Sequence, residues 1–241
     1  MLNLSRAARI RFAVTSSMLL GGAVLAGCGT SNAPGAHPAE TLQSKFVSVV
    51  KTVSPAVVQI ETPSAVGSGI VFDGRGNVVT NAHVVAGAKT FTVTLFRNRK
   101  VRATLVGADP KNDLAVIHMI GATPRPATFA DSSKINVGDL ALAIGNPLGF
   151  QSSVTQGIVS SVNRTVPEGN GVTLTSAIQT SAEINPGNSG GALVNLKGHV
   201  IGIPTLAALD PNLGNAQAPG IGFAITSNRV QKVVSGIIAG R

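Results

Sequence analysis

The sequence has no tryptophan, no tyrosine and a single cysteine, Cys28. Proteins that bind single-stranded nucleic acid stack bases on aromatic side chains, and here only eight phenylalanines are thinly spread, so no nucleic-acid partner is expected. A lone cysteine excludes an intramolecular disulfide bond. Charged residues make up only 12% of the chain and hydrophobic residues 44%, a balance that supports a sizeable core and excludes general disorder.

The formal net charge is +9. Three of the positive charges lie near the N-terminus, at Arg6, Arg9 and Arg11. The one local cluster is Arg97, Arg99, Lys100 and Arg102. Because these cations alternate along a predicted strand, a solvated strand face explains them better than a nucleic-acid site. The remaining excess charge is typical of a soluble protein with weak attraction to anionic surfaces.

Residues 1–27 have the pattern of an export signal, with a positive start followed by an uncharged apolar run over 18–27. That run is shorter than the ~20 residues of a membrane-spanning helix. Leu25-Ala26-Gly27-Cys28 then resembles the lipobox of bacterial lipoproteins, in which the signal is cut before a cysteine that becomes lipidated. We therefore expect a bacterial lipoprotein anchored through Cys28 on the outer face of the cell membrane, in the periplasm or cell envelope. An ordinary cleavable signal with an incidental Cys28 is the alternative.

Residues 28–44 are predicted to form a flexible tether, because the segment 30–40 is rich in Pro, Gly, Ala and Ser and lacks apolar periodicity. His37 lies in this tether and is expected to be solvated.

Residues 45–241 are predicted to form one all-β domain. Frequent Gly, Pro, Val and Ile favour short strands joined by tight turns. A short helix is expected over 46–53. Strands are expected over 56–61, 68–72, 77–80, 90–96, 101–108, 114–119, 140–145, 151–162, 174–180, 191–194, 200–204 and 222–225. A proline-containing break near 121–131 divides them into barrels over about 55–125 and 130–226. A C-terminal helix over about 227–240 would start at a Ser227 or Asn228 cap.

The segment 185–191, Asn-Pro-Gly-Asn-Ser-Gly-Gly, suits a nucleophilic serine. A serine hydroxyl needs a base to become a useful nucleophile, and the oxyanion it creates needs backbone N–H donors. Gly187 can adopt backbone angles closed to other residues and turn its N–H toward the site, and Ser189 can supply a second N–H. Gly190 and Gly191 would leave room for a substrate. A plain turn between two strands is the alternative.

The base should be a histidine, because the pKa of histidine lies near neutrality. His83 ends an apolar strand and opens a turn of small residues, whereas His118 lies inside a strand pattern and His199 follows a glycine in a turn. Each of the three taken alone is more often structural. Asp113, directly before an apolar strand, is the candidate that would orient the histidine, and Asp109 competes with it although Asp109-Pro110 is typical of a turn.

The order His83, Asp113, Ser189 is that of chymotrypsin-type proteases. The motifs Thr-Asn-Ala-His-Val-Val at 80–85, Asn-Asp-Leu-Ala-Val at 112–116 and Gly-Asn-Ser-Gly-Gly at 187–191 resemble the HtrA/Deg family of trypsin-like serine proteases. Flanking segments at 67–72, 145–149, 155–160 and 222–225 agree with this resemblance.

The resemblance implies two six-stranded antiparallel β-barrels with the active site between them. It also implies a serine endopeptidase that acts on unfolded or damaged exported proteins through the triad and an acyl-enzyme. Backbone N–H groups of Gly187, Asn188 and Ser189 would form the oxyanion hole. A homotrimer is one arrangement found in the family. No cofactor and no metal is expected, because the histidines and acids show no ligand spacing.

Two features depart from the family. Members usually carry PDZ domains after the protease, and none is expected within this chain. Glu183 lies six positions before Ser189, where trypsin holds its specificity acid, and would favour cleavage after Lys or Arg; a solvent-facing Glu183 with the family's preference for small aliphatic residues is the alternative. Substrate contacts are expected from Glu183, Ile184, Ile203, Pro204 and Thr205, with Pro204 lacking a backbone donor on the pairing strand.

Three other functions compete with proteolysis. A latent or silent protease-like protein could bind unfolded chains as a chaperone. An esterase would match Gly-x-Ser-x-Gly at 187–191, but its acid should follow the serine and precede a late histidine, and no acid lies between Ser189 and His199. A purely structural lipoprotein would leave the three motifs unexplained.

Overall fold

The computed structural model describes residues 38–122, 124–146, 153–169, 172–185, 187–210 and 216–240. The predicted export signal, Cys28 and the first part of the predicted tether lie outside the described residues. Within the described part of the chain, no helix combines the length and the apolar character needed to cross a membrane.

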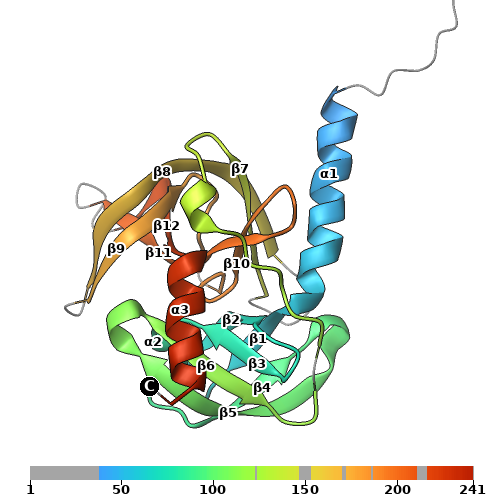
Figure 1. Ribbon diagram of the computed structural model, residues 1–241, viewed down its shortest axis with the longest axis vertical. Coiled ribbons are helices and arrows are strands. Elements are labelled where there is room, and N and C mark those ends of the chain that lie inside the picture. The colour runs from blue at the N-terminus through green and yellow to red at the C-terminus, as the bar shows by residue number, and fades with distance from the viewer. Residues whose placement is uncertain are drawn as a thin grey trace, which may run out of the picture. The chain divides into compact units, whose positions relative to one another are not determined.

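The described strands form two closed antiparallel barrels of six strands each, as the sequence predicted (Figure 1). The first barrel has the order β1-β2-β3-β6-β5-β4 and the second the order β10-β11-β12-β9-β8-β7. The strands of the first barrel are β1 (Val57–Glu61), β2 (Val66–Val71), β3 (Asn77–Thr80), β4 (Thr90–Thr94), β5 (Lys100–Asp109) and β6 (Leu114–Met119). Those of the second are β7 (Leu140–Gly145), β8 (Ser153–Gly169), β9 (Val172–Thr180), β10 (Ala192–Asn195), β11 (Val200–Asp210) and β12 (Ala216–Thr226).

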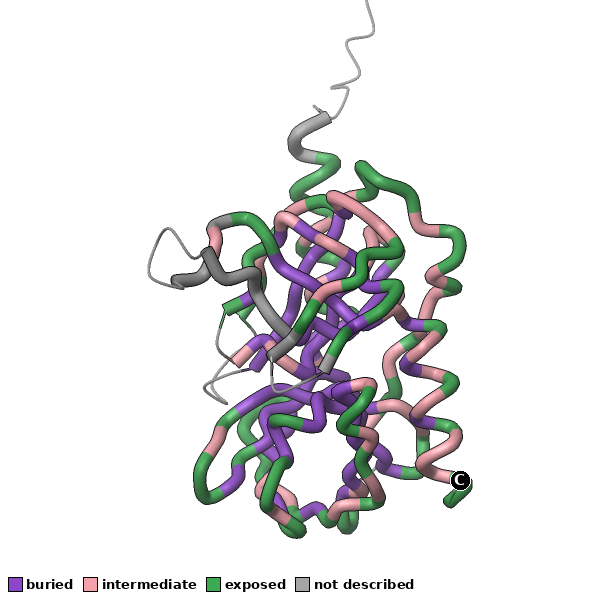
Figure 2. Tube along the Cα trace, turned by 90° about the vertical axis from the view of Figure 1, so that its left-hand side faces the viewer, coloured by how far each residue is buried: buried purple, intermediate pink, exposed green. Residues whose placement is uncertain are grey.

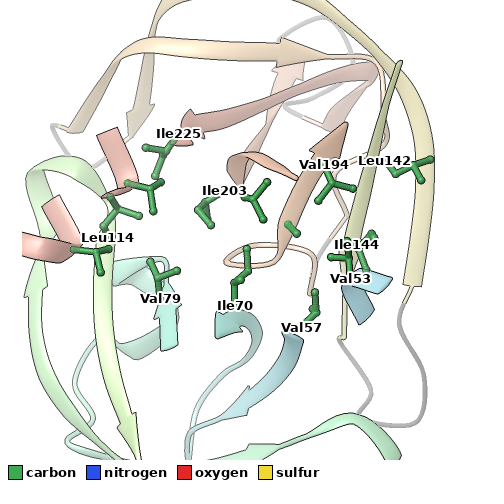
Figure 3. Packing of buried hydrophobic residues seen from close by; sticks show 14 of the residues in the cluster. Val53, Val57, Ile70, Val79, Leu114, Leu142, Ile144, Val194, Ile203 and Ile225 are labelled. Atoms are coloured by element: carbon green, nitrogen blue, oxygen red, sulfur yellow. The ribbon is translucent and has the colours of Figure 1, made fainter. Parts of the chain in front are cut away.

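The strands nearest the junction of the barrels are apolar on both faces. Successive side chains of a strand point to opposite sides, so Val78 packs inside the first barrel while Val79 joins the core between the barrels. On β7, Ala143 packs inside the second barrel and Ile144 joins the same central core. Figure 3 shows this central core, in which Ile70 and Leu114 of the first barrel lie opposite Ile203 and Ile225 of the second. Burial on both faces explains why these segments read as near-continuous apolar runs.

Helix α3 (Ser227–Ile238) follows β12 and packs on β5, β6 and β11 (Figure 1). The predicted helix is confirmed, and Val230 and Val234 on it are fully buried. The predicted cap is wrong: Thr226 occupies the N-cap without a side-chain bond. Ser227 Oγ instead donates to the carbonyl of Ala130 at 2.8 Å, because this end of the helix lies against the segment that joins the two barrels.

The tether prediction is wrong from residue 38 onward, because α1 spans Pro38–Val53. Proline fits the first turn of a helix, where the missing N–H has no intrahelical partner, and Ala39 and Glu40 are good helix formers. At the other end Val49 and Val53 are buried in the central core, so packing stabilises the last turns of α1.

Several strands are longer than predicted, and two, β1 and β4, are shorter. β8 continues to Gly169 and β11 to Asp210, because each pairs with the next strand in a long hairpin. β4 ends at Thr94, and a 3-10 turn, η2 (Phe96–Asn98), follows it. Residues 151–152 of one predicted strand lie outside the described residues. Figure 2 shows the buried residues concentrated along the strands and the exposed ones at the turns.

Candidate functional site

His83 and Asp113 are joined by three hydrogen bonds. His83 lies on a one-turn helix, α2 (Ala82–Val85), and its ring Nδ1 is 3.0 Å from both carboxylate oxygens of Asp113. The backbone N–H of His83 also donates to Asp113 Oδ1 at 3.1 Å. The His83 side chain is 51% exposed and that of Asp113 only 6%. A buried carboxylate therefore fixes the orientation of a solvent-accessible imidazole.

The backbone around Asp113 places its carboxylate behind His83. Asp113 caps a 3-10 turn, η3 (Pro110–Asn112), in the left-handed conformation with φ of 48°. The buried Asn81 side chain donates through Nδ2 to the Asp113 carbonyl at 3.0 Å, which ties the start of α2 to this turn. The competing acid Asp109 accepts from Asn112 N and Nδ2, so its predicted turn chemistry is confirmed.

The pKa of Asp113 lies below its usual value. Burial raises this pKa. The hydrogen bonds and charge interaction with His83, together with a hydrogen bond from Thr205, lower it by more than burial raises it. Asp113 is therefore ionised at neutral pH. An ionised carboxylate can only accept hydrogen bonds, so His83 Nδ1 carries a proton and neutral His83 presents its Nε2 lone pair on the other side of the ring.

Thr205 connects Asp113 to Ser189. Its hydroxyl donates to Asp113 Oδ2 at 2.6 Å, and its backbone carbonyl accepts from Ser189 Oγ at 3.0 Å. The structure thus brings the three candidate catalytic residues into one site, with Thr205 between the acid and the serine. Thr205 was expected only as a substrate contact. The link to Asp113 crosses 92 positions of sequence, so no local pattern could have indicated it.

The turn that carries Ser189 exposes backbone donors. Gly187 has φ of 97°, a conformation that favours glycine. In the described part of the chain, the N–H groups of Gly187 and Ser189 have no acceptor. The Asn188 N–H donates to the Asn185 carbonyl at 3.0 Å, so its predicted place in the oxyanion hole is wrong. A tight turn uses this amide internally and leaves the two flanking amides for an anion.

The prediction that Gly190 and Gly191 leave room for a substrate is also wrong. Gly190 has φ of 81°, and a side chain there would collide with the Ser68 carbonyl and the Thr80 hydroxyl of the first barrel. At Gly191 a side chain would collide with the Ile144 carbonyl of β7. These glycines let the turn pack against both barrels, and neither makes room for a substrate.

The predicted substrate-contact residues lie in different environments. Ile203 is fully buried in the central core, because it faces the first barrel, so its expected contact is wrong. The Pro204 carbonyl accepts from the Gly190 N–H at 3.0 Å, so Pro204 contacts the turn that carries Ser189, and its pairing with substrate stays a prediction. The Ile184 side chain is buried and packs on Gly222, whereas the Glu183 side chain is exposed.

His37 lies outside the described residues, and His118 and His199 make contacts outside this site. His118 Nδ1 lies 3.2 Å from Asn77 Oδ1 on neighbouring strands, and the His199 backbone N–H donates to Asn195 Oδ1 in the turn between β10 and β11. Cys28 lies outside the described residues. Among the residues described, no group of three His, Cys, Asp or Glu side chains could hold a metal ion.

Comparisons with known proteins agree with this fold. The family model of the trypsin-like peptidase domain matches residues 67–203. Serine protease Do-like HtrA of Lactococcus lactis subsp. cremoris is 45% identical over 181 residues, which cover 71% of this chain and 44% of that protein. Periplasmic serine endoprotease DegP of Escherichia coli strain K12 is 47% identical over 178 residues, which cover 72% of this chain and 36% of DegP.

A solved structure of the HtrA-type protease AlgW with a tripeptide matches with a TM-score of 0.73 and 39% identity. The match covers 81% of this chain and 64% of the AlgW chain. The chain therefore belongs to the trypsin-like peptidases and, among these, to the HtrA-type serine proteases. The family predicted from the motifs is confirmed. The chain spans less than half the length of the two curated relatives named above.

Proposed function

We propose that this protein is a serine endopeptidase in which Ser189 is the nucleophile, His83 the general base and Asp113 the residue that orients His83. The observation that carries this proposal is the continuous network from His83 through Asp113 and Thr205 to Ser189. The same residues occur in the chain order of chymotrypsin-type triads.

The first half of the reaction forms an acyl-enzyme. Ser189 Oγ attacks the carbonyl carbon of the peptide bond as its proton passes to His83 Nε2. The negative charge that develops on the carbonyl oxygen accepts hydrogen bonds from the N–H groups of Gly187 and Ser189. The imidazolium then gives its proton to the leaving amine, the C–N bond breaks and the first product departs.

The second half hydrolyses the acyl-enzyme. A water molecule attacks the ester carbonyl while His83 accepts one of its protons, and His83 then returns that proton to Ser189 Oγ as the ester bond breaks. Asp113 stays ionised throughout, because its pKa is below its usual value, and stabilises each imidazolium. No proton is transferred to Asp113 in this scheme.

One contact favours a second candidate, a latent or silent binder of unfolded chains. A hydroxyl has a single proton, and Ser189 Oγ donates it to the Thr205 carbonyl. In this arrangement the proton does not point at His83. We propose that the hydroxyl rotates toward His83 when substrate binds, since hydrogen bonds of catalytic groups often tighten only in the substrate complex. A permanently silent site would lack that rotation.

The proposed substrates are unfolded or damaged polypeptides outside the cytoplasm. DegP and the HhoA-like relative from Haemophilus influenzae are described as periplasmic proteases, and AlgW has been solved with a tripeptide and with a decapeptide. The buried Ile184 on Gly222 supports a preference for small apolar residues before the cut, and the exposed Glu183 offers no buried charge to attract Lys or Arg.

We also propose that the chain is exported and anchored in the membrane through a lipidated Cys28. The support is the sequence Leu25-Ala26-Gly27-Cys28 behind a positive and apolar leader. Mass spectrometry of the protein from membranes should find acyl chains on an N-terminal Cys28, and Cys28→Ser should release the protein into the soluble fraction. An unmodified cysteine in a membrane-free protein would contradict the anchor.

Hydrolysis of an unfolded protein tests the enzymatic proposal. The full chain should degrade reduced, unfolded casein, and Ser189→Ala and His83→Ala should each lower turnover by about 10⁶-fold. His118→Ala is the matched control, because His118 lies outside the site, and should keep the activity of the parent. Binding of casein without cleavage by the folded parent would favour the silent binder.

A further inference from the structure

Ser68 is a fully buried serine of the first barrel that contacts the Ser189 turn of the second. It lies on β2 between Gly67 and Gly69, where side chains would collide with Val84 and Val78 of the first barrel. Side chains alternate along a strand, so the two glycines face the first barrel and Ser68 faces the other way. Its hydroxyl is therefore the only side-chain group that this Gly-Ser-Gly segment presents to the second barrel.

The Ser68 hydroxyl makes two hydrogen bonds whose directions are determined. The backbone N–H of Asn146, directly after β7, donates to Ser68 Oγ at 2.8 Å. Because a carbonyl can only accept, the hydroxyl uses its own proton for the second bond, which goes to the Gly187 carbonyl at 2.5 Å. The backbone of Ser68 adds a third contact, since its N–H donates to the Ser189 carbonyl at 3.0 Å.

These contacts fix the peptide plane between Gly187 and Asn188. Its carbonyl is bonded to Ser68 Oγ, and its N–H is bonded to the Asn185 carbonyl. A peptide group is planar, so two anchors of this kind determine its orientation. This plane lies between the N–H groups of Gly187 and Ser189. Anchoring it limits how far these two donors can turn relative to each other, because only the backbone dihedrals of Gly187 and Asn188 still separate them from the fixed plane.

We propose that Ser68 is a positioning residue. It holds the N–H groups of Gly187 and Ser189 so that both point at the developing oxyanion. The inference rests on the proposed function. Glycine readily adopts other backbone angles, so Gly187 needs an external anchor to hold its conformation. Ser68 provides that anchor from the first barrel, and the Asn146 amide keeps the hydroxyl proton directed at the Gly187 carbonyl. Ser68 itself does not touch the reacting atoms.

Steady-state kinetics and amide exchange of the full chain test this role together. Removing a whole oxyanion donor costs about 10²–10³-fold in kcat, so Ser68→Ala, which only loosens the donors, should lower kcat by about 10–100-fold. KM should change less than about twofold, because the loss falls on the transition state. The Asn188 amide should exchange with solvent faster than in the parent.

Two further variants keep the test decisive. Thr94→Val removes a buried hydroxyl of β4 that has no partner among the described residues, and should leave kcat and Asn188 exchange unchanged. Ser68→Cys keeps a similar side chain, but its thiol is a weak donor. It should lower kcat and speed Asn188 exchange as expected for Ser68→Ala, and it takes the place of Ser68→Ala if the alanine variant fails to fold.

The outcomes separate the two proposals. If the parent hydrolyses peptides but the Ser68 variants match it in kcat and in Asn188 exchange, the positioning role is wrong. If Thr94→Val lowers kcat equally, the effect of Ser68→Ala is general destabilisation and the role is again wrong. If the folded parent has no activity, the proposed function fails, and faster Asn188 exchange in the Ser68 variants alone would support the positioning of the turn.

Discussion

Thr205 lies on β11, and its hydroxyl donates a 2.6 Å hydrogen bond to the carboxylate of Asp113. This contact joins the acid of the first barrel to β11 of the second. It lowers the pKa of Asp113 and gives the carboxylate a partner besides His83. The acid is therefore held by both barrels, and its position depends on their packing.

We predict that Thr205→Val lowers kcat by about tenfold with little change in KM. A hydrogen bond to a charged group is worth about 1.5–3 kcal/mol, and part of that value should appear only when His83 becomes charged in the transition state. Thr205→Ser keeps the hydroxyl and should keep most of the activity. Equal loss in both variants would show that the methyl group matters and the hydrogen bond does not.

Gly190→Ala should destabilise the fold by more than about 1 kcal/mol, because the residue has positive φ and a side chain would collide with the first barrel. Urea denaturation measures this difference. Gly74→Ala is the matched control, since a side chain there meets no atom within 4 Å, and its stability should stay within about 0.5 kcal/mol of the parent. A stable Gly190→Ala protein would contradict the close packing of the turn on Ser68.

Asp73→Asn should alter stability in a pH-dependent way. Burial raises the pKa of Asp73, but hydrogen bonds from Asn77 and Arg75 lower it below its usual 3.8. A lowered pKa means that the carboxylate stabilises the fold above pH 3.8 and that this contribution is lost as pH falls through the folded value. The variant should lose about 1 kcal/mol at pH 7 and converge with the parent in acid. Thermal melts of the variant and the parent at pH 7 and in acid measure this loss of stability. A stability difference that stays the same at both would contradict the role of the Asp73 carboxylate.

Cleavage-site profiling with a peptide library should find small apolar residues before the scissile bond. Ile184 is buried on Gly222, and Glu183 is exposed, so Glu183→Gln should leave the profile unchanged. A parent preference for Lys or Arg that disappears in Glu183→Gln would reverse this assignment and restore the trypsin-like hypothesis.

The fold could be predicted from the sequence because its apolar runs are buried on both faces. Runs such as 114–119 and 140–145 are bounded by turn residues, and their boundaries match the observed strands. The start of α1 could not be predicted in the same way. A Pro- and Ala-containing segment fits either a tether or the first turn of a helix, and packing of Val49 and Val53 far along the chain decides between them.

The candidate site could likewise be predicted from the sequence only in part. His83, Asp113 and Ser189 stand in motifs that indicate their chemistry locally, and the structure brings them together. The contacts of Thr205 with Asp113 and of Ser68 with Gly187 join residues of different barrels, so sequence spacing carries no sign of them. The reason for Gly190 was equally hidden, because its close neighbour is a backbone carbonyl of the other barrel.

The most direct test of the proposed mechanism is labelling of the full chain with a fluorophosphonate probe, which reacts only with an activated serine. We predict one adduct, located on Ser189 by mass spectrometry, and no labelling of Ser189→Ala or His83→Ala. A folded parent that stays unlabelled, or one labelled on another serine or equally well without His83, would contradict the assignment of Ser189 as a nucleophile activated by His83.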